Sequence, residues 1–365
     1  MAKEVADPFL DFAKFFYQTD WHEQPLRITN GVSTEQKVIT GNELGTDSRR
    51  ADPSLSMRDS VHISAVTPPE CKAALELIFA AIAPELRNQQ IAATYQQASA
   101  GLVSLDGLLV ARDGAELVGA VWVSQLPGRT AAIWPARTVP RESVPLALRL
   151  LQSADDYLVA RRVRLAQCVV EVDCGPDVDI LRVAGYEHAA DLLYMASTVD
   201  VFPESPPGQG LHFERYQPEG ERRMANILAQ TYQGTLDCPA LDGVRSNDDV
   251  LTGYRATGDA ASNHWYFIRD KIGDVGCLLL TDHSKDSQWE LIYVGFIPAS
   301  RGKAWGLEAT RYAQWLTRQA GRERLILAVD AANHPALRMY ALAGFAAWDR
   351  RSVFQKVFSP LDAIT

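Results

Sequence analysis

The chain has 365 residues, of which 47% are hydrophobic and 22% charged, with a net charge of −9. This composition predicts about two globular domains with ample core, and no apolar run approaches the roughly 18 residues of a membrane-spanning helix. The acidic balance argues against nucleic acid as a partner. Five cysteines without a Cys-x-x-Cys pair argue against a disulfide framework or a zinc site, so we expect a cytoplasmic protein without a metal.

The first 58 residues form an extension that belongs to neither of the folded segments described below. A short apolar segment begins it, and a polar, turn-rich stretch follows from residue 30 to 56. Such a composition is typical of a partly disordered segment, to which we assign no function.

Residues 60–201 contain the pattern of a first α/β domain. Gly107–Arg112 and Glu116–Ser124 predict a hairpin, and Leu165–Val172 predicts a buried strand. A proline- and glycine-rich linker follows over residues 202–210. Residues 211–358 then repeat the pattern, beginning with a hairpin at His264–Arg269 and Asp274–Thr281.

A strand, a short loop and a helix follow one another between residues 288 and 320. Gln288–Ile297 is mostly β-branched or aromatic, which favours a strand, and Gly295 predicts a bulge or a close approach within it. Pro298 ends the strand, and a helix is predicted from about 304 to 320. The loop between them contains no proline, so every N–H of Arg301-Gly302-Lys303-Ala304-Trp305-Gly306 is available. Backbone N–H groups beside a helix N-terminus favour a phosphate anion.

The residues after this helix define which phosphate-binding family the chain resembles. The loop has neither Gly-x-x-x-x-Gly-Lys-Ser/Thr nor Gly-x-Gly-x-x-Gly, which excludes two nucleotide-binding motifs. Its pattern, Arg-x-x-Gly/Ala-x-Gly, is followed by an apolar strand at Leu325–Val329 and by Asn333, Ala336, Tyr340, Gly344 and Phe345. This combination resembles the GCN5-related N-acetyltransferases (GNAT), with Ala304 in place of the more usual glycine.

The resemblance implies an α/β (α+β) fold of two tandem GNAT-like domains, each a mixed, mostly antiparallel twisted sheet flanked by helices. It also implies an acetyl-CoA-dependent N-acyltransferase, with acetyl-CoA as co-substrate and a small-molecule or protein amine as acceptor. A non-catalytic CoA-binding or scaffold module is the alternative. The cofactor-binding residues that the resemblance implies are Val294, Gly295, Phe296, Arg301, Gly302, Lys303, Ala304, Trp305, Gly306 and Asn333.

The two predicted domains differ at this loop. Leu181–Tyr186 matches the segment that ends in Gly344 and Phe345, yet Leu181 and Cys174 stand where the second copy has Tyr340 and Asn333. The first copy also has prolines and no glycine in the loop region. We therefore expect a degenerate N-terminal copy that serves as a scaffold, or else one that binds CoA in an altered mode. A single larger α/β domain is the alternative architecture.

Two residues are candidates for catalysis. The resemblance implies that Tyr340 is the acid that protonates the departing thiolate, although its spacing also fits an ordinary core residue. Glu290 is predicted on the same strand face as Ile292, Val294 and Phe296, where it is a candidate base or a solvated strand-end carboxylate. Asn333 fits a helix cap as well as a ligand contact.

The acceptor site is predicted in the segment from Thr231 to Arg245. Asp237 and Asp242 are candidates for binding an amine, and Cys238 for contacting a ligand. A capped, turn-forming loop is the alternative interpretation of the same residues. The histidines of this half have no metal-ligand spacing and are given no role.

Overall fold

The computed structural model describes residues 61–139, 143–172, 174–208, 210–239, 244–257 and 259–358. The extension predicted over residues 1–58 and the candidate acceptor residue Asp242 lie outside these ranges. Within them, the elements form two runs in the same order: a strand, two helices, three strands, a helix, a strand, a helix and a last strand. The first run has one additional, two-residue strand.

The first run extends from residue 61 to 198. It comprises β1 (Val61–Ala65), α2 (Cys71–Ile78), α3 (Pro84–Ser99), β2 (Leu108–Asp113), β3 (Glu116–Leu126), β4 (Thr130–Ile133), β5 (Arg137–Thr138), α4 (Val144–Ala160), β6 (Leu165–Glu171), α5 (Gly175–Val183) and β7 (Glu187–Thr198). The second run comprises β8 (His212–Arg215), α6 (Glu221–Tyr232), α7 (Asn247–Arg255), β9 (Asp259–Arg269), β10 (Asp274–His283), β11 (Gln288–Phe296), α8 (Trp305–Gln319), β12 (Arg324–Asp330), α9 (His334–Leu342) and β13 (Ala346–Val357).

One sheet passes through both runs. Its strand order is β1-β2-β3-β4-β6-β13-β7-β12-β11-β10-β9-β8, with β5 beside β3. Among the described pairings, β4–β6 and β11–β12 are parallel and the others antiparallel. The predicted class, a mixed and mostly antiparallel sheet flanked by helices, is confirmed.

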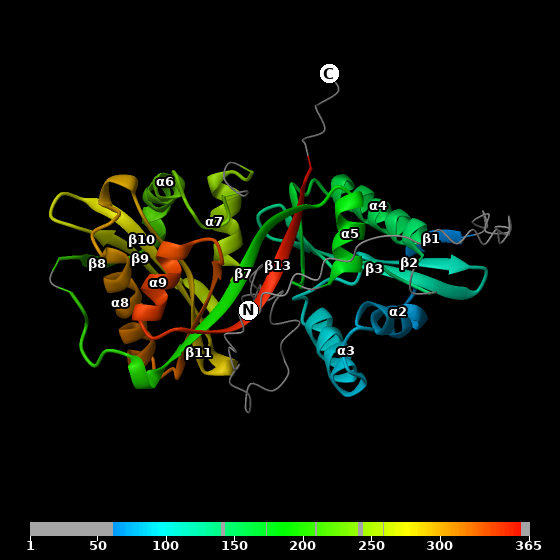
Figure 1. Ribbon diagram of the computed structural model, residues 1–365, viewed down its shortest axis with the longest axis horizontal. Coiled ribbons are helices and arrows are strands. Elements are labelled where there is room, and N and C mark those ends of the chain that lie inside the picture. The colour runs from blue at the N-terminus through cyan, green and yellow to red at the C-terminus, as the bar shows by residue number, and fades with distance from the viewer. Residues whose placement is uncertain are drawn as a thin grey trace, which may run out of the picture.

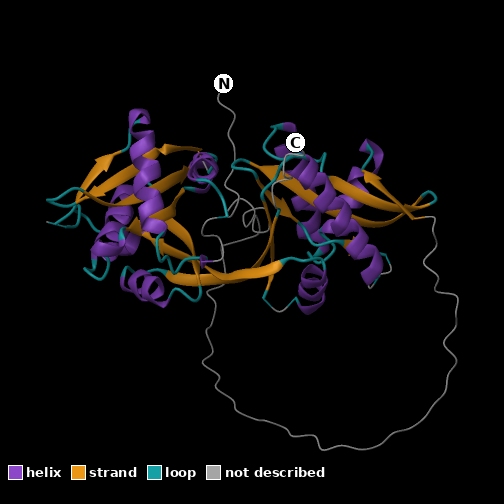
Figure 2. Ribbon diagram, turned by 90° about the horizontal axis from the view of Figure 1, so that it is seen from above, coloured by secondary structure: helices purple, strands orange, loops and turns teal. Residues whose placement is uncertain are grey.

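The last strands of the two runs are exchanged. β7 ends the first run but pairs with β12 of the second, and β13 ends the second run but pairs with β6 of the first. β7 and β13 also pair with each other, so they join the two lobes at the centre of the molecule (Figures 1 and 2). The linker predicted over 202–210 therefore lies between the two runs along the chain, but the sheet is continuous from one lobe to the other.

Helices cover both faces of the sheet in each lobe (Figure 2). In the first lobe α2 and α3 pack on one face and α4 and α5 on the other. In the second lobe α6 and α7 pack on one face, and α8 and α9 on the other. The central strands β6 and β12 are largely buried, as expected from their continuous apolar sequences.

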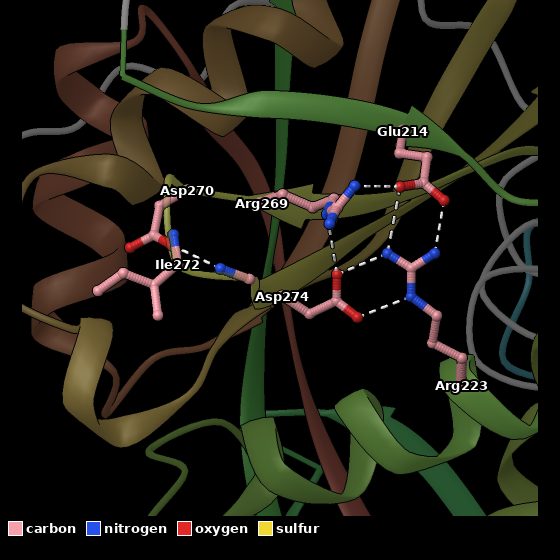
Figure 3. A network of polar contacts seen from close by, with 7 residues as sticks. Glu214, Arg223, Arg269, Asp270, Ile272 and Asp274 are labelled. Atoms are coloured by element: carbon pink, nitrogen blue, oxygen red, sulfur yellow. Dashed lines mark hydrogen bonds and ion pairs between the residues drawn. The ribbon is translucent and has the colours of Figure 1, made fainter.

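Polar contacts fix α6 on the outer strands of the second lobe (Figure 3). Arg223 of α6 donates hydrogen bonds to both oxygens of Asp274, at 2.7 and 2.6 Å, and to Glu214 of β8. Arg269 of β9 donates to the same Glu214 at 2.9 Å. The Arg223 guanidinium also lies 3.8 Å from the ring centre of Phe267. These contacts hold the first turn of α6 against β8, β9 and β10.

A second set of contacts joins the lobes. The Arg129 guanidinium, on the turn between β3 and β4, binds both carboxylate oxygens of Asp249 on α7. Gly128 beside it has φ +76°, and a side chain there would begin 2.2 Å from the Asp249 carbonyl oxygen. The turn can therefore dock on α7 only with glycine at this position.

Candidate functional site

The sheet opens between β11 and β12. These parallel strands pair only from Gln288 to Glu290, with Arg324 to Ile326, although both strands continue beyond that point. β11 remains paired with β10 on its other side, and β12 with β7. The described backbone from Leu291 to Phe296 therefore has one edge outside any ladder. Such an edge can donate and accept hydrogen bonds from an extended ligand lying in the gap.

β11 contains a bulge, but three residues before the predicted position. Leu279 pairs with Tyr293 and Leu280 with Leu291, so Ile292 is the additional residue. The prediction of a bulge at Gly295 is wrong, because Gly295 pairs in register with Cys277. Glycine is needed there for space: a Cβ on Gly295 would lie 2.5 Å from the Tyr293 hydroxyl oxygen.

The bulge changes which side chains share a face. Val294 and Phe296 pack with the α8–α9 core, and so do Trp289 and Leu291. Ile292 and Tyr293 pack with the α6–α7 core. Glu290 lies between Trp289 and Leu291 and therefore faces α6 and α7. The predicted shared face of Glu290 with Val294 and Phe296 is wrong, because the additional residue reverses the alternation, whereas its shared face with Ile292 is confirmed.

The loop after β11 brings backbone N–H groups to the open end of the gap. A short 3₁₀ turn at Pro298–Ser300 is followed by Gly302 with φ +77° and Ala304 with φ +60°, and α8 begins at Trp305. The first N–H groups of α8 have no acceptor within the helix. Gly306 allows α9 to pack closely, since a Cβ there would lie 2.6 Å from Met339 Sδ. Lys303 lies over the Trp305 ring, with its Nζ 4.4 Å from the ring centre.

The Arg301 side chain is used inside the protein. Its guanidinium donates to the carbonyl oxygens of Phe296 at 3.0 Å, Gly234 at 2.9 Å and Thr231 at 2.8 Å. It thereby ties the segment after α6 to the end of β11. Its backbone N–H donates to the Pro298 carbonyl oxygen at 3.3 Å, so the expectation that every N–H of the loop is available is wrong for Arg301.

Ala304 occupies a left-handed conformation that glycine adopts without strain. For an alanine this conformation costs on the order of 1–2 kcal/mol, which exceeds the entropic cost of a glycine. We expect Ala304→Gly to raise the free energy of unfolding by about 0.5–1 kcal/mol, measured by urea denaturation. Ala320→Gly, at the other end of α8 where φ is −78°, is the matched control and is expected to lower it. A loss of stability in both variants would contradict the inference that the left-handed conformation of Ala304 is strained.

Tyr340 lies on α9, buried in the α8–α9 core. Burial raises the pKa of its phenol well above the ordinary value, and the nearby Asp237 charge raises it further. The phenol therefore holds its proton at neutral pH. Its ring contacts Phe345, with the ring centres 5.5 Å apart.

The predicted acceptor residues meet the end of β12. Asp237 accepts a hydrogen bond from the Asp330 N–H at 3.0 Å, and the Cys238 N–H donates to Asp330 Oδ2 at 3.2 Å. The Asn333 side chain also bonds Asp237, and it caps α9 by accepting from the Ala336 N–H at 3.3 Å. Burial raises the pKa of the Asp237 carboxyl and of the Cys238 thiol. The cap predicted for Asn333 is confirmed, and Asp237, Cys238, Asn333 and Tyr340 lie in one region.

Glu290 is fully buried and has a partner that the sequence did not indicate. Its Oε2 lies 2.7 Å from Nε2 of His283, which is buried as well. Thr281 lies opposite Glu290 and His283 opposite Gln288, so the two side chains are diagonal neighbours on one face of β10 and β11. The solvated strand-end interpretation of Glu290 is therefore wrong. Only the register of the two strands reveals this contact.

Three tyrosines gather beside the same face, and the sequence analysis missed them. The Tyr232 and Tyr254 hydroxyls lie 2.7 Å apart, and the Tyr293 hydroxyl lies 2.9 Å from Thr231 Oγ1. The rings come from α6, α7 and β11 and pack edge-on or tilted. Their separation in the chain leaves no local motif that would have indicated the cluster.

In the first lobe an ion pair connects the segment that follows β4 with the start of α5. Arg137 follows β4, and its Nη2 lies 2.9 Å from Oδ2 of Asp177 in the first turn of α5. The Cys174 thiol donates to the same carboxylate at 2.9 Å. Burial of the Cys174 thiol and this hydrogen bond raise its pKa to about 11. In chain order this charged pair occupies the positions that correspond to the loop after β11 and the start of α9.

Among the described residues, no group of three or more histidine, cysteine or acidic side chains is arranged to hold a metal ion. Nor does this part of the chain contain a helix with the length and apolarity required to cross a bilayer.

Comparison with known proteins relates this geometry to one family. The model of the acetyltransferase (GNAT) family matches residues 230–345. No curated protein matches the chain. Among solved structures, a GCN5-related N-acetyltransferase from Sphaerobacter thermophilus is 17% identical, with a TM-score of 0.57, over 82% of this chain and 96% of its own.

Two further structures are similar. The glucosamine N-acetyltransferase region of a fungal multi-domain β-N-acetylglucosaminidase is 12% identical, with a TM-score of 0.52, over 81% of this chain and 38% of its own. A tandem GNAT protein from the clavulanic acid pathway is 15% identical over 83% of this chain and 100% of its own, but its TM-score of 0.45 is too low to support an inference. Residues 230–345 therefore match the GNAT acetyltransferase family, and the described part of the chain has a fold of the GNAT type.

Proposed function

We propose that the chain is an acetyl-CoA-dependent N-acyltransferase that transfers an acetyl group to the primary amine of a small molecule or protein. The observation that carries the proposal is the gap between β11 and β12. The gap begins at Glu290 and leads to the N-terminus of α8. The α8–α9 core contains Tyr340, which holds its proton. CoA has the matching form, with an extended pantetheine arm that ends in a diphosphate.

The diphosphate and the pantetheine arm of acetyl-CoA have proposed binding surfaces in the second lobe. The diphosphate would accept hydrogen bonds from backbone N–H groups between Arg301 and Gly306, where the α8 dipole favours negative charge. The pantetheine amides would bind the open edge of β11, including Val294, Gly295 and Phe296. Asn333 would contribute through its position at the start of α9. We infer one CoA site per chain, because in the first lobe the Arg137–Asp177 pair connects the loop after β4 with the start of α5, at the positions that correspond in chain order to the proposed site.

The proposed reaction is direct transfer. The acceptor amine attacks the acetyl carbonyl carbon, and its surplus proton passes to Glu290. N–H groups on the open edge of β11 stabilise the developing oxyanion. Breaking of the carbon–sulfur bond then releases a thiolate, which takes a proton from Tyr340. Burial disfavours the thiolate as it disfavours the phenolate, so the transfer does not require a strong acid.

The acceptor would approach from the α6–α7 face, onto which Glu290 projects. Asp237 is the proposed contact for the acceptor's ammonium group, because its carboxylate lies within electrostatic reach of Tyr340 and close to Asp330. Cys238 would line the same region.

The proposal predicts that a suitable amine accelerates thiol release from acetyl-CoA. We expect Tyr340→Phe to lower kcat by about 100-fold, with little change in KM for acetyl-CoA, because only the proton donor is lost. Tyr312→Phe makes the same chemical change on α8, where the ring stacks on Phe213, and is expected to leave kcat unchanged. The measurement is thiol release across an amine and polyamine panel.

Two outcomes would contradict parts of this proposal. If CoA binds but no amine raises thiol release above background, the non-catalytic binding module replaces the enzyme. If Tyr340→Phe keeps full activity, the leaving-group acid is another residue even though the reaction class holds.

A further inference from the structure

His283 and Glu290 form a closed polar pair in the second lobe. Their contact is 2.7 Å between Nε2 and Oε2, and the two residues are only 6% and 1% exposed. They come from neighbouring strands, β10 and β11, on the face toward α6 and α7. Two buried ionisable groups at this distance require each other, because removing one leaves a polar partner in an apolar setting.

The surroundings of the pair differ on its two sides. Glu290 is the last residue of β11 that pairs with β12, so it lies where the gap begins. Across from it, the Thr281 hydroxyl donates to the Thr257 carbonyl oxygen at 2.8 Å, and both threonines are fully buried. His283 is the last residue of β10 and is followed by the exposed turn Ser284–Asp286. His283 thus bonds a buried carboxylate and is next along the chain to an exposed turn.

Three charged residues lie close to His283 in the chain. Lys285 and Asp286 are on the exposed turn that follows it. Asp282 lies next to it in the strand but projects to the opposite face, where Arg322 binds both of its oxygens at 2.8 and 2.7 Å. In the described contacts Asp282 is therefore committed to Arg322, and Glu290 is the carboxylate bonded to His283.

A buried catalytic base needs a path by which the proton that it accepts can leave. Each acetyl transfer would leave one proton on Glu290, and that proton must leave before the next turnover. Imidazole accepts a proton on one ring nitrogen while releasing one from the other, at pH values near neutrality. We propose that His283 is the positioning residue of Glu290 and carries its proton toward the exposed turn. This inference rests on the proposed function.

The test separates proton transfer from structural support. His283→Gln keeps a hydrogen-bond donor for Glu290 but does not titrate. We expect its kcat to fall at least about 10-fold, with KM for acetyl-CoA within about twofold of wild type. His283→Ala is expected to regain activity when free imidazole is added, since the small molecule can occupy the vacated space. His264→Gln is the control, because its ring lies tilted against Trp289 on the opposite face, with the ring centres 4.3 Å apart.

The outcomes distinguish this inference from the proposal on which it rests. Thiol release by wild type, together with a full kcat in His283→Gln, would overturn the role of His283 alone. The same holds if imidazole leaves His283→Ala unchanged while its melting temperature shows that it is folded. A wild-type protein that acetylates no amine would overturn the proposed function, and the role of His283 with it.

Discussion

Residues 211–358 produced alone are expected to remain unfolded or to aggregate, although they contain the complete GNAT-family match. In the full chain β12 pairs with β7 as well as with β11, and β13 pairs with β6 and β7. The isolated half therefore loses both described partners of β13 and leaves β12 with only its short pairing to β11. The core of the second lobe would also lose Met195, Phe202 and Leu193, which belong to the first run or the linker. Burial of each such side chain contributes about 1.5–3 kcal/mol. Their sum is comparable to the roughly 5–15 kcal/mol that stabilises a whole domain.

Cleavage of the linker provides the matched control. A protease site placed within residues 203–207 would cut the connection without removing either exchanged strand. We expect the nicked halves to elute together in size-exclusion chromatography and to separate only in denaturant. A cooperative unfolding transition of 211–358 alone would show that β13 can take the place of β7, and would contradict the requirement for exchange.

Gly306→Val is expected to lower the affinity for CoA by at least about 100-fold. A β-branched side chain at this position would cover the first N–H groups of α8, where the diphosphate is proposed to bind. Losing two charge-assisted hydrogen bonds would remove about 3–5 kcal/mol of binding free energy, which is a factor of about 100 to several thousand. The change is measured by calorimetric titration with CoA.

A second substitution separates blocked binding from disturbed packing. A Cβ on Gly306 would lie 2.6 Å from Met339 Sδ, so the valine also presses on α9. Gly306→Val combined with Met339→Ala relieves that contact, and we expect it to restore the melting temperature but not CoA binding. Recovery of binding in the double variant would mean that Gly306 serves helix packing alone.

Local sequence signals predicted much of the second lobe. The strand expected over 288–297 is observed at 288–296, and the helix expected from 304 to 320 is observed at 305–319. The Asn333 cap and the hairpin between β9 and β10 were predicted as well. In each case the signal comes from residues within one turn or one strand, where backbone preference and capping operate.

The features that the sequence did not reveal depend on pairing between distant segments. The exchange of β7 and β13 cannot be read from either strand, because both possible partners are apolar strands of similar length. The bulge at Ile292 is visible only as a shift against Leu279 and Leu280 of β10. That shift also decides which face of the sheet Glu290 shares with later residues of β11. Counting alternate residues without knowing the strand register therefore placed Val294 and Phe296 on the same face as Glu290, which is wrong.

The His283–Glu290 contact has the same origin. The two residues are seven positions apart, across a turn whose register fixes whether they meet. Arg301 illustrates a further limit, because a basic residue in a phosphate loop suggests a charge contact. Its guanidinium instead binds three backbone carbonyl oxygens, a need that arises only when the segment after α6 reaches the end of β11.

Counting CoA molecules bound per chain tests the central claim most directly. Calorimetric titration of the full-length protein should give one site, which the Gly306→Val and Met339→Ala double variant abolishes and Arg137→Met leaves intact. Two sites per chain, or full binding by the double variant, would contradict the account by placing the nucleotide somewhere other than the start of α8.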